Sequence, residues 1–217
     1  MSSYDVRRTT MVATQVRPSD VTKFPVIDAM LAVPRERFVP RDLLEAAYIG
    51  ENLSLSDERS LLEPRTFAKM LDALDIQRED LVLDVACGYG YSSAVIGHIA
   101  EAVVAVESDN DMAAEAQVLL AENGADGVAV HHGPLQEGAA QFGPFDVICI
   151  QGGVETVSET IIDQLKEDGR IACLFMDGPL GEVRIGYKHA RQMNWRRAFN
   201  ASAPLLDEFK LNRTFSF

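Results

Sequence analysis

Two carboxylates and a glycine-rich segment are the residues whose types and spacing could do chemistry. The segment reads Leu-Asp-Val-Ala-Cys-Gly-Tyr-Gly-Tyr over residues 83–91 and begins within a short apolar run. Glycines let a backbone turn tightly and approach a ligand closely. Glu107 ends the next apolar run, 17 residues beyond Gly90. A tight loop after the first strand, with an acid at the end of the second, fits a ligand site at the carboxyl ends of an open sheet.

The charges around this loop favour a cationic nucleoside over one that carries phosphates. Position 93 is Ser, where a dinucleotide-binding G-x-G-x-x-G motif has Gly or Ala, and the loop holds no Lys or Arg. The Glu107 carboxylate can accept both hydroxyls of a ribose, and Asp84 adds negative potential. S-adenosylmethionine, with its sulfonium and amino group, has the matching charge. The alternative is that the glycines only form a turn and that Glu107 is a solvated strand end.

The hydrophobic pattern places these residues in a chain that alternates between strands and helices. Apolar runs at 81–85, 103–106, 128–130, 146–150 and 171–176 read as buried strands, and the stretches at 92–99, 112–122 and 161–166 read as helices. This alternation indicates a mainly parallel sheet with helices on both faces. Segments 183–190 and 196–203 read as extended and could close the sheet edge as an antiparallel hairpin. We therefore expect a Rossmann-like α/β fold with a seven-stranded sheet.

The first 64 residues do not follow this alternation. Short helices are expected at 26–33 and 42–47, and a polar loop runs from Tyr48 to Pro64. A loop of that length inside a compact domain is often functional. The chain is therefore divided into an N-terminal helical and substrate-loop region, residues 1–64, and a ligand-binding domain, residues 65–217.

Composition excludes several classes of protein. The 217 residues include 33 Asp and Glu against 20 Lys and Arg, a net charge of −13, which argues against binding to nucleic acid. The three cysteines are far apart, and His131-His132 has no third ligand at a clear spacing, so no disulfide framework and no metal site is expected. No run approaches 18 apolar residues and no signal peptide is visible, so we expect a cytoplasmic protein without a membrane segment.

Several segments resemble one family of enzymes. Residues 83–94 resemble the first motif of class I S-adenosylmethionine-dependent methyltransferases. The segments at 11–17, 26–30 and 33–40, followed by Tyr48, resemble the N-terminal region of protein-L-isoaspartate O-methyltransferases, and 144–146 and 165–170 match later motifs of that family. The resemblance implies a monomer that methylates the carboxylate of L-isoaspartyl residues in damaged proteins, a repair reaction. The cofactor would be S-adenosyl-L-methionine and its product S-adenosyl-L-homocysteine, with a protein or peptide as substrate.

The same resemblance assigns cofactor contacts to the ends of four strands. Glu107 would hold the ribose with Ser108 beside it, and His132 and Gly133 would lie near the adenine. Gln151 would lie near the sulfonium and the acceptor. The methionine part would contact six residues of the glycine-rich segment: Asp84, Ala86, Cys87, Gly88, Gly90 and Tyr91.

The segment that would bind the acceptor departs from the family. The family has Gln-Thr-Ile-Ser-x-Pro there, and residues 59–64 of this chain read Arg-Ser-Leu-Leu-Glu-Pro. The family places its serine at the reacting carboxylate, but Leu62 cannot donate a hydrogen bond. Ser60 keeps a hydroxyl at the Thr position, and Arg59 could anchor a carboxylate through a bidentate pair or could be a solvated loop charge. Ser60 and Arg59 are therefore the candidate catalytic residues.

Three functions remain open from the sequence. The first is methylation of L-isoaspartyl carboxylates. The second is methyl transfer to a different acceptor, favoured by Leu62 and by Gln151-Gly152-Gly153, where the family usually has Thr-Ala-Ala. The third is a non-catalytic protein that binds the cofactor.

Overall fold

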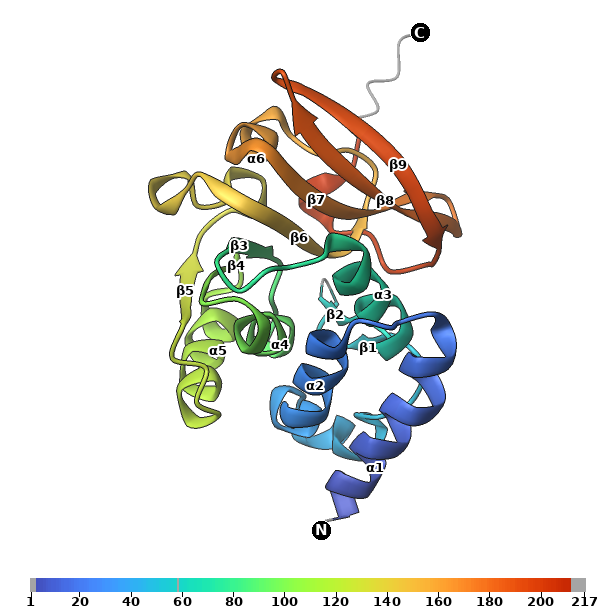
Figure 1. Cartoon of the computed structure of the whole chain (residues 1–217). Helices are drawn as coiled ribbons and strands as arrows, with labels where there is room; N and C mark the ends of the chain where they lie inside the picture. Colours follow the sequence, from blue (N-terminus) through green and yellow to red (C-terminus); the bar gives the residue numbers. More distant parts are fainter. Residues whose placement is uncertain (1–2, 58, 212–217) are drawn as a thin grey trace, which may run out of the picture.

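A single seven-stranded sheet forms the centre of the molecule (Figure 1). The structure is a computed structural model that describes residues 3–57 and 59–211. The order of the strands is β5-β4-β3-β6-β7-β8-β9. Their bounds are β3 Leu81–Val85, β4 Ala102–Glu107, β5 Val128–His132, β6 Phe145–Val154, β7 Leu165–Asp177, β8 Leu180–His189 and β9 Gln192–Asn200.

The strand directions follow the pattern expected from the sequence. Strands β5, β4, β3, β6 and β7 run parallel, and β8 and β9 complete the edge as antiparallel strands. The parallel strands are nearly continuous apolar runs because helices cover both of their faces. The predicted Rossmann-like fold and its C-terminal hairpin are therefore confirmed.

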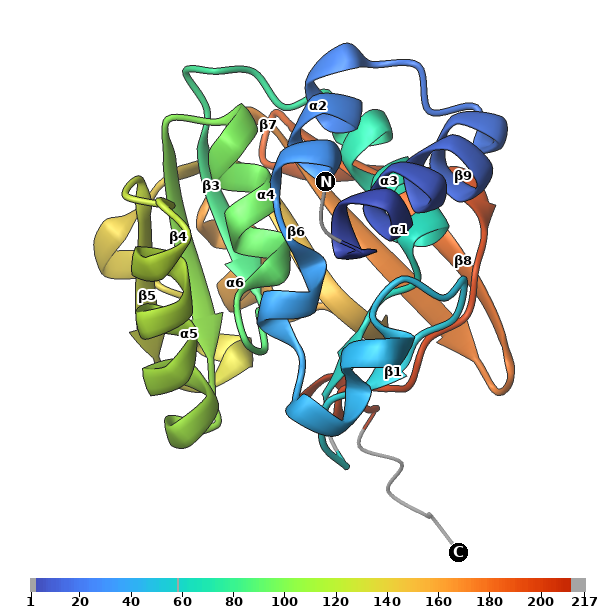
Figure 2. The same ribbon diagram turned by 90° about the horizontal axis from the view of Figure 1, so that it is seen from below.

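The two faces of the sheet are covered unequally (Figure 2). One face packs against α3 (Pro64–Leu74), α4 (Tyr91–Ile99) and α5 (Asn110–Glu122). An outer layer covers these helices and consists of α1 (Ser3–Met11), the π-helical turn Val12–Val16, which packs on α3, and α2 (Phe24–Ala32), which packs on α3 and α4. The other face has a smaller apolar core around Leu83, Ile148 and Phe209. It is covered by α6 (Glu159–Asp163) and the 3₁₀ turns Leu135–Glu137, Ala140–Phe142 and Asp207–Phe209.

Helix α3 illustrates how local sequence sets these elements. Pro64 occupies the first helical position, where its missing N–H costs nothing. Phe67, Met70, Leu71 and Leu74 recur at helical spacing and are all buried. The helix ends at Asp75, whose φ of 52° is left-handed. Its N-terminus directly follows the acceptor segment, so α3 fixes one end of that segment.

Three local predictions differ from the structure. The helix expected over 161–166 ends at Asp163, because Leu165 already belongs to β7 and pairs with Phe145 of β6. The helix expected over 42–47 is a 3₁₀ helix, Arg41–Ala46. Within the expected loop 48–64 the chain forms a short antiparallel hairpin, β1 (Leu53–Ser54) with β2 (Ser60–Leu61). In the described part of the chain, no helix has the length and hydrophobicity required to cross a bilayer. The division at residue 64 stays a prediction.

Candidate functional site

The glycine-rich loop joins β3 to α4 and is fastened to the neighbouring strand. The N–H groups of Ala86 and Cys87 both donate to the carbonyl of Val106 in β4. Gly88 and Gly90 have φ values of 57° and 93°, in the left-handed region that favours glycine. The two glycines therefore allow a turn that brings the start of α4 close to the end of β4.

Asp84, near the end of β3, is a buried carboxylate with three side-chain donors. Ser92 and Ser93 of α4 each donate a hydroxyl hydrogen bond over 2.6 Å, and Gln151 of β6 donates its amide over 2.7 Å. Burial raises the pKa of Asp84 to about 6, and the three hydrogen bonds oppose that rise. The structure thus brings together Asp84 and Gln151, two of the predicted cofactor residues, from adjacent strands.

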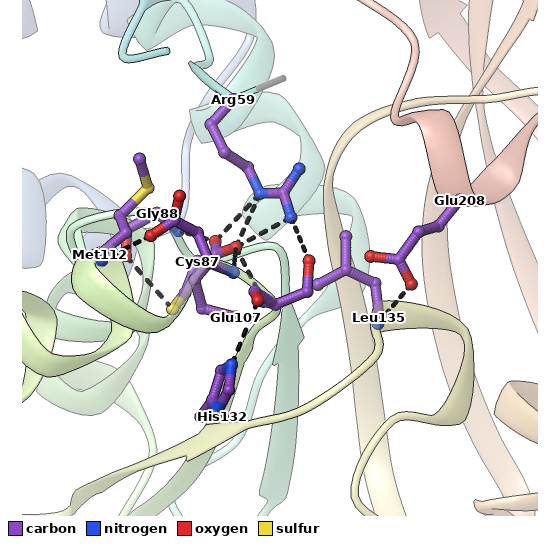
Figure 3. Close-up of polar contacts among 10 residues, drawn as sticks. Arg59, Cys87, Gly88, Glu107, Met112, His132, Leu135 and Glu208 are labelled. Atoms are coloured by element: carbon purple, nitrogen blue, oxygen red, sulfur yellow. Dashed lines mark hydrogen bonds and ion pairs between the residues drawn. The ribbon is translucent and has the colours of Figure 1, made fainter. Parts of the chain in front are cut away.

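Glu107, the last residue of β4, is fully buried and held by backbone donors (Figure 3). The N–H of Gly88 donates to it over 2.9 Å, that of Ser108 over 2.8 Å and that of Asp109 over 3.0 Å. These contacts orient the carboxylate beside the glycine-rich loop. Its position is therefore the one expected of a ribose-binding acid.

The guanidinium of Arg59 also lies on this carboxylate (Figure 3). Its Nε is 2.8 Å from one oxygen of Glu107 and 3.1 Å from the other, and its Nη2 donates to the Ser108 hydroxyl over 2.6 Å. The ion pair is buried, with side-chain exposures of 5% for Arg59 and 0% for Glu107. From the sequence, Arg59 was expected to bind the carboxylate of the acceptor. In the structure it instead pairs with Glu107, the carboxylate predicted to bind the ribose.

The end of β5 adjoins the end of β4. The Nε2 of His132 lies 3.2 Å from the carbonyl oxygen of Ser108, and the N–H of Gly133 donates to the carbonyl of Glu107 over 3.1 Å. Just beyond, the N–H of Leu135 donates to the Glu208 carboxylate over 2.8 Å (Figure 3). The residues predicted to bind the adenine and the ribose are therefore neighbours. The 3₁₀ turn Asp207–Phe209, in the C-terminal segment, holds the loop at Leu135 that follows them.

Cys87 and Tyr91 are buried components of the loop. Burial raises the pKa of the Cys87 thiol well above its ordinary value, so the thiolate needed of a nucleophile is disfavoured. The ring of Tyr91 packs against Phe38 and Phe67, and the guanidinium of Arg35 lies 4.8 Å from its centroid. Tyr91 therefore contributes to packing around the loop.

Leu62 is 2% exposed and fills the position at which the family has serine. Its carbonyl accepts a hydrogen bond from Nη2 of the buried Arg35 over 2.8 Å, and Arg35 Nε donates to Ala47. Ser60 and Leu62 line a cavity of about 10 Å³ together with Tyr91 and Gln151. The roles of Ser60 and Arg59 in catalysis stay predictions.

Two features of the site could not be seen in the sequence. Arg35 gives no signal of its role, because its carbonyl partners lie 12 and 27 positions away. Gly152 and Gly153 are glycines because the C-terminal segment crosses them. A Cβ on Gly152 would lie 2.7 Å from Leu206 Cγ, and one on Gly153 would lie 3.0 Å from the carbonyl oxygens of Ala203 and Pro204.

The residues fit S-adenosylmethionine in charge, and the hairpin β1–β2 lies against the predicted cofactor residues Gly88 and Glu107. Asp84 and Glu107 supply two carboxylates that suit a cationic nucleoside, and the glycine-rich loop carries no cation, although Arg59 of the hairpin is ion-paired with Glu107. Leu55 of the hairpin lies against the glycine loop, 2.9 Å from where a Cβ on Gly88 would stand. The cavity of about 10 Å³ cannot hold the methionine part, since that is barely the space of one water molecule.

The sheet order, the glycine loop and the acids at the strand ends define an S-adenosylmethionine-dependent methyltransferase. The family model for protein-L-isoaspartate(D-aspartate) O-methyltransferase matches residues 7–179. The chain belongs to this family, as its sequence predicts.

Named relatives agree with this assignment. The chain is 33% identical over 161 residues to a protein-L-isoaspartate O-methyltransferase of Opitutus terrae, covering 74% of this chain and 69% of the relative. It is 35% identical over 161 residues to one of Rhodopseudomonas palustris, covering 74% of each chain.

Solved structures share the fold. A protein-L-isoaspartate O-methyltransferase superposes with a TM-score of 0.81 at 23% identity, over 90% of this chain and 64% of that one. A Plasmodium falciparum protein described as a protein-L-isoaspartate O-methyltransferase, solved in complex with S-adenosyl-L-homocysteine, has a TM-score of 0.78 at 15% identity. That match covers 96% of this chain and 100% of the other.

Proposed function

We propose that this chain transfers a methyl group from S-adenosylmethionine to the carboxylate of L-isoaspartyl residues in proteins or peptides. The observation that carries the proposal is the pair of carboxylates at adjacent strand ends. Glu107 is held by three backbone N–H groups and Asp84 by Gln151, within a chain of this family. A monomer that acts in the cytoplasm on a protein substrate, without nucleic acid, belongs to the same proposal.

The chemistry asks mainly for alignment from the protein. Bound S-adenosylmethionine supplies an electrophilic methyl group on a sulfonium. The acceptor carboxylate is already a nucleophile, so no general base has to remove a proton. Glu107 would hold the ribose hydroxyls, Asp84 would favour the cationic end electrostatically, and Gln151 would orient groups near the acceptor. The hydroxyl of Ser60 is the polar group that the acceptor segment offers to a carboxylate.

A second acceptor class is favoured by one observation at the acceptor segment. Leu62 presents an apolar side chain to the same small cavity as Gln151, where the family has a serine. A leucine desolvates a carboxylate without offering it a hydrogen bond, which disfavours an anionic acceptor. An uncharged nucleophile would suffer less, so methyl transfer to a neutral acceptor is the second candidate function.

A groove at the carboxyl ends of β6 and β7 is our proposed place for the polypeptide that carries the acceptor. Its volume is about 690 Å³, and its lining includes Glu155 and Asp177. Glu182 in the same lining is ion-paired with Arg184 and Arg197, so the excess negative charge comes from the first two acids. This charge favours acceptor segments with basic flanking residues. The groove adjoins Met176, whose side chain packs over Gly153 beyond Gln151.

Transfer of a labelled methyl group tests the proposal. Three peptides would be compared: one with L-isoaspartate and basic flanks, one with L-isoaspartate and acidic flanks, and one with ordinary aspartate and basic flanks. Label on both isoaspartyl peptides, greater with basic flanks, is the expected result. Absence of label on both, with label on a neutral acceptor, would replace the first function with the second.

A further inference from the structure

Glu107 has no acceptor capacity left for a ribose while Arg59 stays in place. A carboxylate offers about four lone-pair directions. Three are taken by the N–H groups of Gly88, Ser108 and Asp109. The guanidinium takes the rest, because Arg59 Nε approaches both oxygens and Nη2 lies 2.8 Å from Oε1. Ribose hydroxyls therefore compete directly with Arg59.

The hairpin β1–β2 holds Arg59 in this position. The carbonyl of Arg59 accepts hydrogen bonds from the N–H groups of Leu55 over 2.8 Å and Ser56 over 3.2 Å. The side chain of Leu55 lies against Gly88 at the same time. Asn52 anchors the base of the hairpin, since its amide donates to the Ser202 carbonyl and its oxygen accepts from the N–H of Glu63.

Arg59 and Ser60 are adjacent in the hairpin but line two different spaces, one open to solvent and one internal. Arg59 lines an open groove of about 430 Å³ with Asp57, Ser108 and Asp109. Ser60 lines the internal cavity of about 10 Å³ beside Gln151. The hairpin therefore stands between solvent and the place where the methionine part has to lie.

We propose that Arg59 is a latch: it closes the nucleoside site through its ion pair with Glu107, and S-adenosylmethionine has to displace it to bind. The inference rests on the proposed function, because it assumes that this site takes the cofactor. The displaced guanidinium regains its hydration, and a ribose hydroxyl takes the direction that it leaves free on Glu107, so neither partner of the buried pair is left uncompensated. The family motif that this segment resembles has Gln there, which carries no charge. Arg59 therefore sets the cofactor affinity of this particular chain.

Calorimetric titration of the full chain with S-adenosyl-L-homocysteine and S-adenosyl-L-methionine tests the latch. Arg59→Gln removes the charge and the bidentate contact. If the open form is populated at about one tenth or less, removing the latch tightens binding by about ten-fold or more. Arg7→Gln is the matched control, because it makes the same charge change at the exposed Arg7–Glu45 pair, and its affinity should equal that of the unaltered chain.

A second variant leaves Arg59 and Glu107 intact. Asn52→Ala removes both anchors at the base of the hairpin, so it should also tighten binding, by a smaller factor. This variant decides the question if Arg59→Gln does not fold, which melting curves would reveal.

The outcomes separate the latch from the proposed function. Equal affinity in Arg59→Gln, Asn52→Ala and the unaltered chain overturns the latch alone. Weaker binding in Arg59→Gln means that Arg59 holds the cofactor, and also overturns the latch. If neither ligand binds any variant, the latch and the proposed function both fail. If the ligands bind but no isoaspartyl peptide is labelled, only the acceptor assignment fails.

Discussion

The amide of Gln151 donates a hydrogen bond to the carboxylate of Asp84 over 2.7 Å, and this contact ties β6 to β3. Both side chains are buried, at 5% and 0% exposure respectively. The contact lies between β3 and β6, where the order in which successive strands are added to the sheet reverses its direction. Open α/β sheets bind ligands at such a point. A buried acid at this point has consequences for stability as well as for binding.

The first prediction concerns the pH dependence of stability. The carboxyl of Asp84 has an ordinary pKa of 3.8 and a folded-state pKa of about 6. Between these values the folded chain keeps a proton that the unfolded chain has lost. Stability therefore falls as pH rises from below about 4 to above about 6, by roughly 3 kcal/mol in total, and then levels off.

Asp84→Asn removes this titration. Urea unfolding of both proteins at pH 4 and pH 7 measures the effect, and the other titrating groups cancel in the difference. The unaltered chain should lose roughly 2 kcal/mol relative to the variant between the two pH values, because the unfolded carboxyl is already more than half ionised at pH 4. A difference that does not change with pH would mean that Asp84 titrates as an exposed carboxyl does.

The strand ends were predictable from the sequence because their signals are local. An apolar run followed by a glycine-rich segment locates the end of β3, and an apolar run closed by Glu107 locates the end of β4. Strand β3 pairs in parallel with β4 on one side and β6 on the other, so the carboxyl ends of the three strands meet at one edge of the sheet. The predicted cofactor residues Asp84 and Glu107 therefore lie at that edge.

The partner of Arg59 was not predictable, because it lies 48 positions away and depends on how a polar loop folds. Residues 48–64 have too little apolar periodicity to reveal the hairpin that places the guanidinium. The predicted C-terminal end of α6 was wrong for a similar reason. Helical spacing continues through Leu165, but pairing with Phe145 in the sheet overrides it.

The second prediction concerns Arg35, a buried cation that joins two backbone segments. Its Nε donates to Ala47 over 2.7 Å and its Nη2 to Leu62 over 2.8 Å. A lysine ammonium cannot reproduce this fork, so Arg35→Lys should cost about 2–4 kcal/mol of stability. Arg37→Lys, at an exposed position of the same 3₁₀ helix, should stay within about 0.5 kcal/mol. Chemical unfolding of both variants is the measurement, and similar losses would mean that the fork contributes nothing.

The third prediction separates two costs at Gly88. Its φ of 57° is left-handed, and an added Cβ would lie 2.9 Å from Leu55 Cδ1. Gly178 has a φ of 60° with no atom within 4 Å of such a Cβ, so Gly178→Ala isolates the backbone cost, about 1–2 kcal/mol. Gly88→Ala should cost more than this control.

The additional loss of stability in Gly88→Ala, beyond that of Gly178→Ala, comes from the contact of the new methyl group with Leu55 of the hairpin. Adding Leu55→Ala to Gly88→Ala should recover that excess and leave the backbone cost, which a double-mutant cycle of unfolding free energies measures. If the two substitutions are additive, Leu55 does not restrict the space above Gly88.

The last prediction concerns Leu62, which separates stability from activity. Because its side chain is 2% exposed, Leu62→Ala and Leu62→Ser should each lower stability by about 2–5 kcal/mol. The serine hydroxyl faces the cavity shared with Gln151 and could donate to an acceptor carboxylate there. A hydrogen bond to a charged group is worth about 1.5–3 kcal/mol, so kcat/KM on an isoaspartyl peptide should be about ten-fold higher for Leu62→Ser than for Leu62→Ala. The comparison is made well below both melting temperatures, so that both variants are folded. Equal values would place the acceptor carboxylate away from residue 62 and direct attention to Ser60, whose replacement by Ala should then abolish transfer.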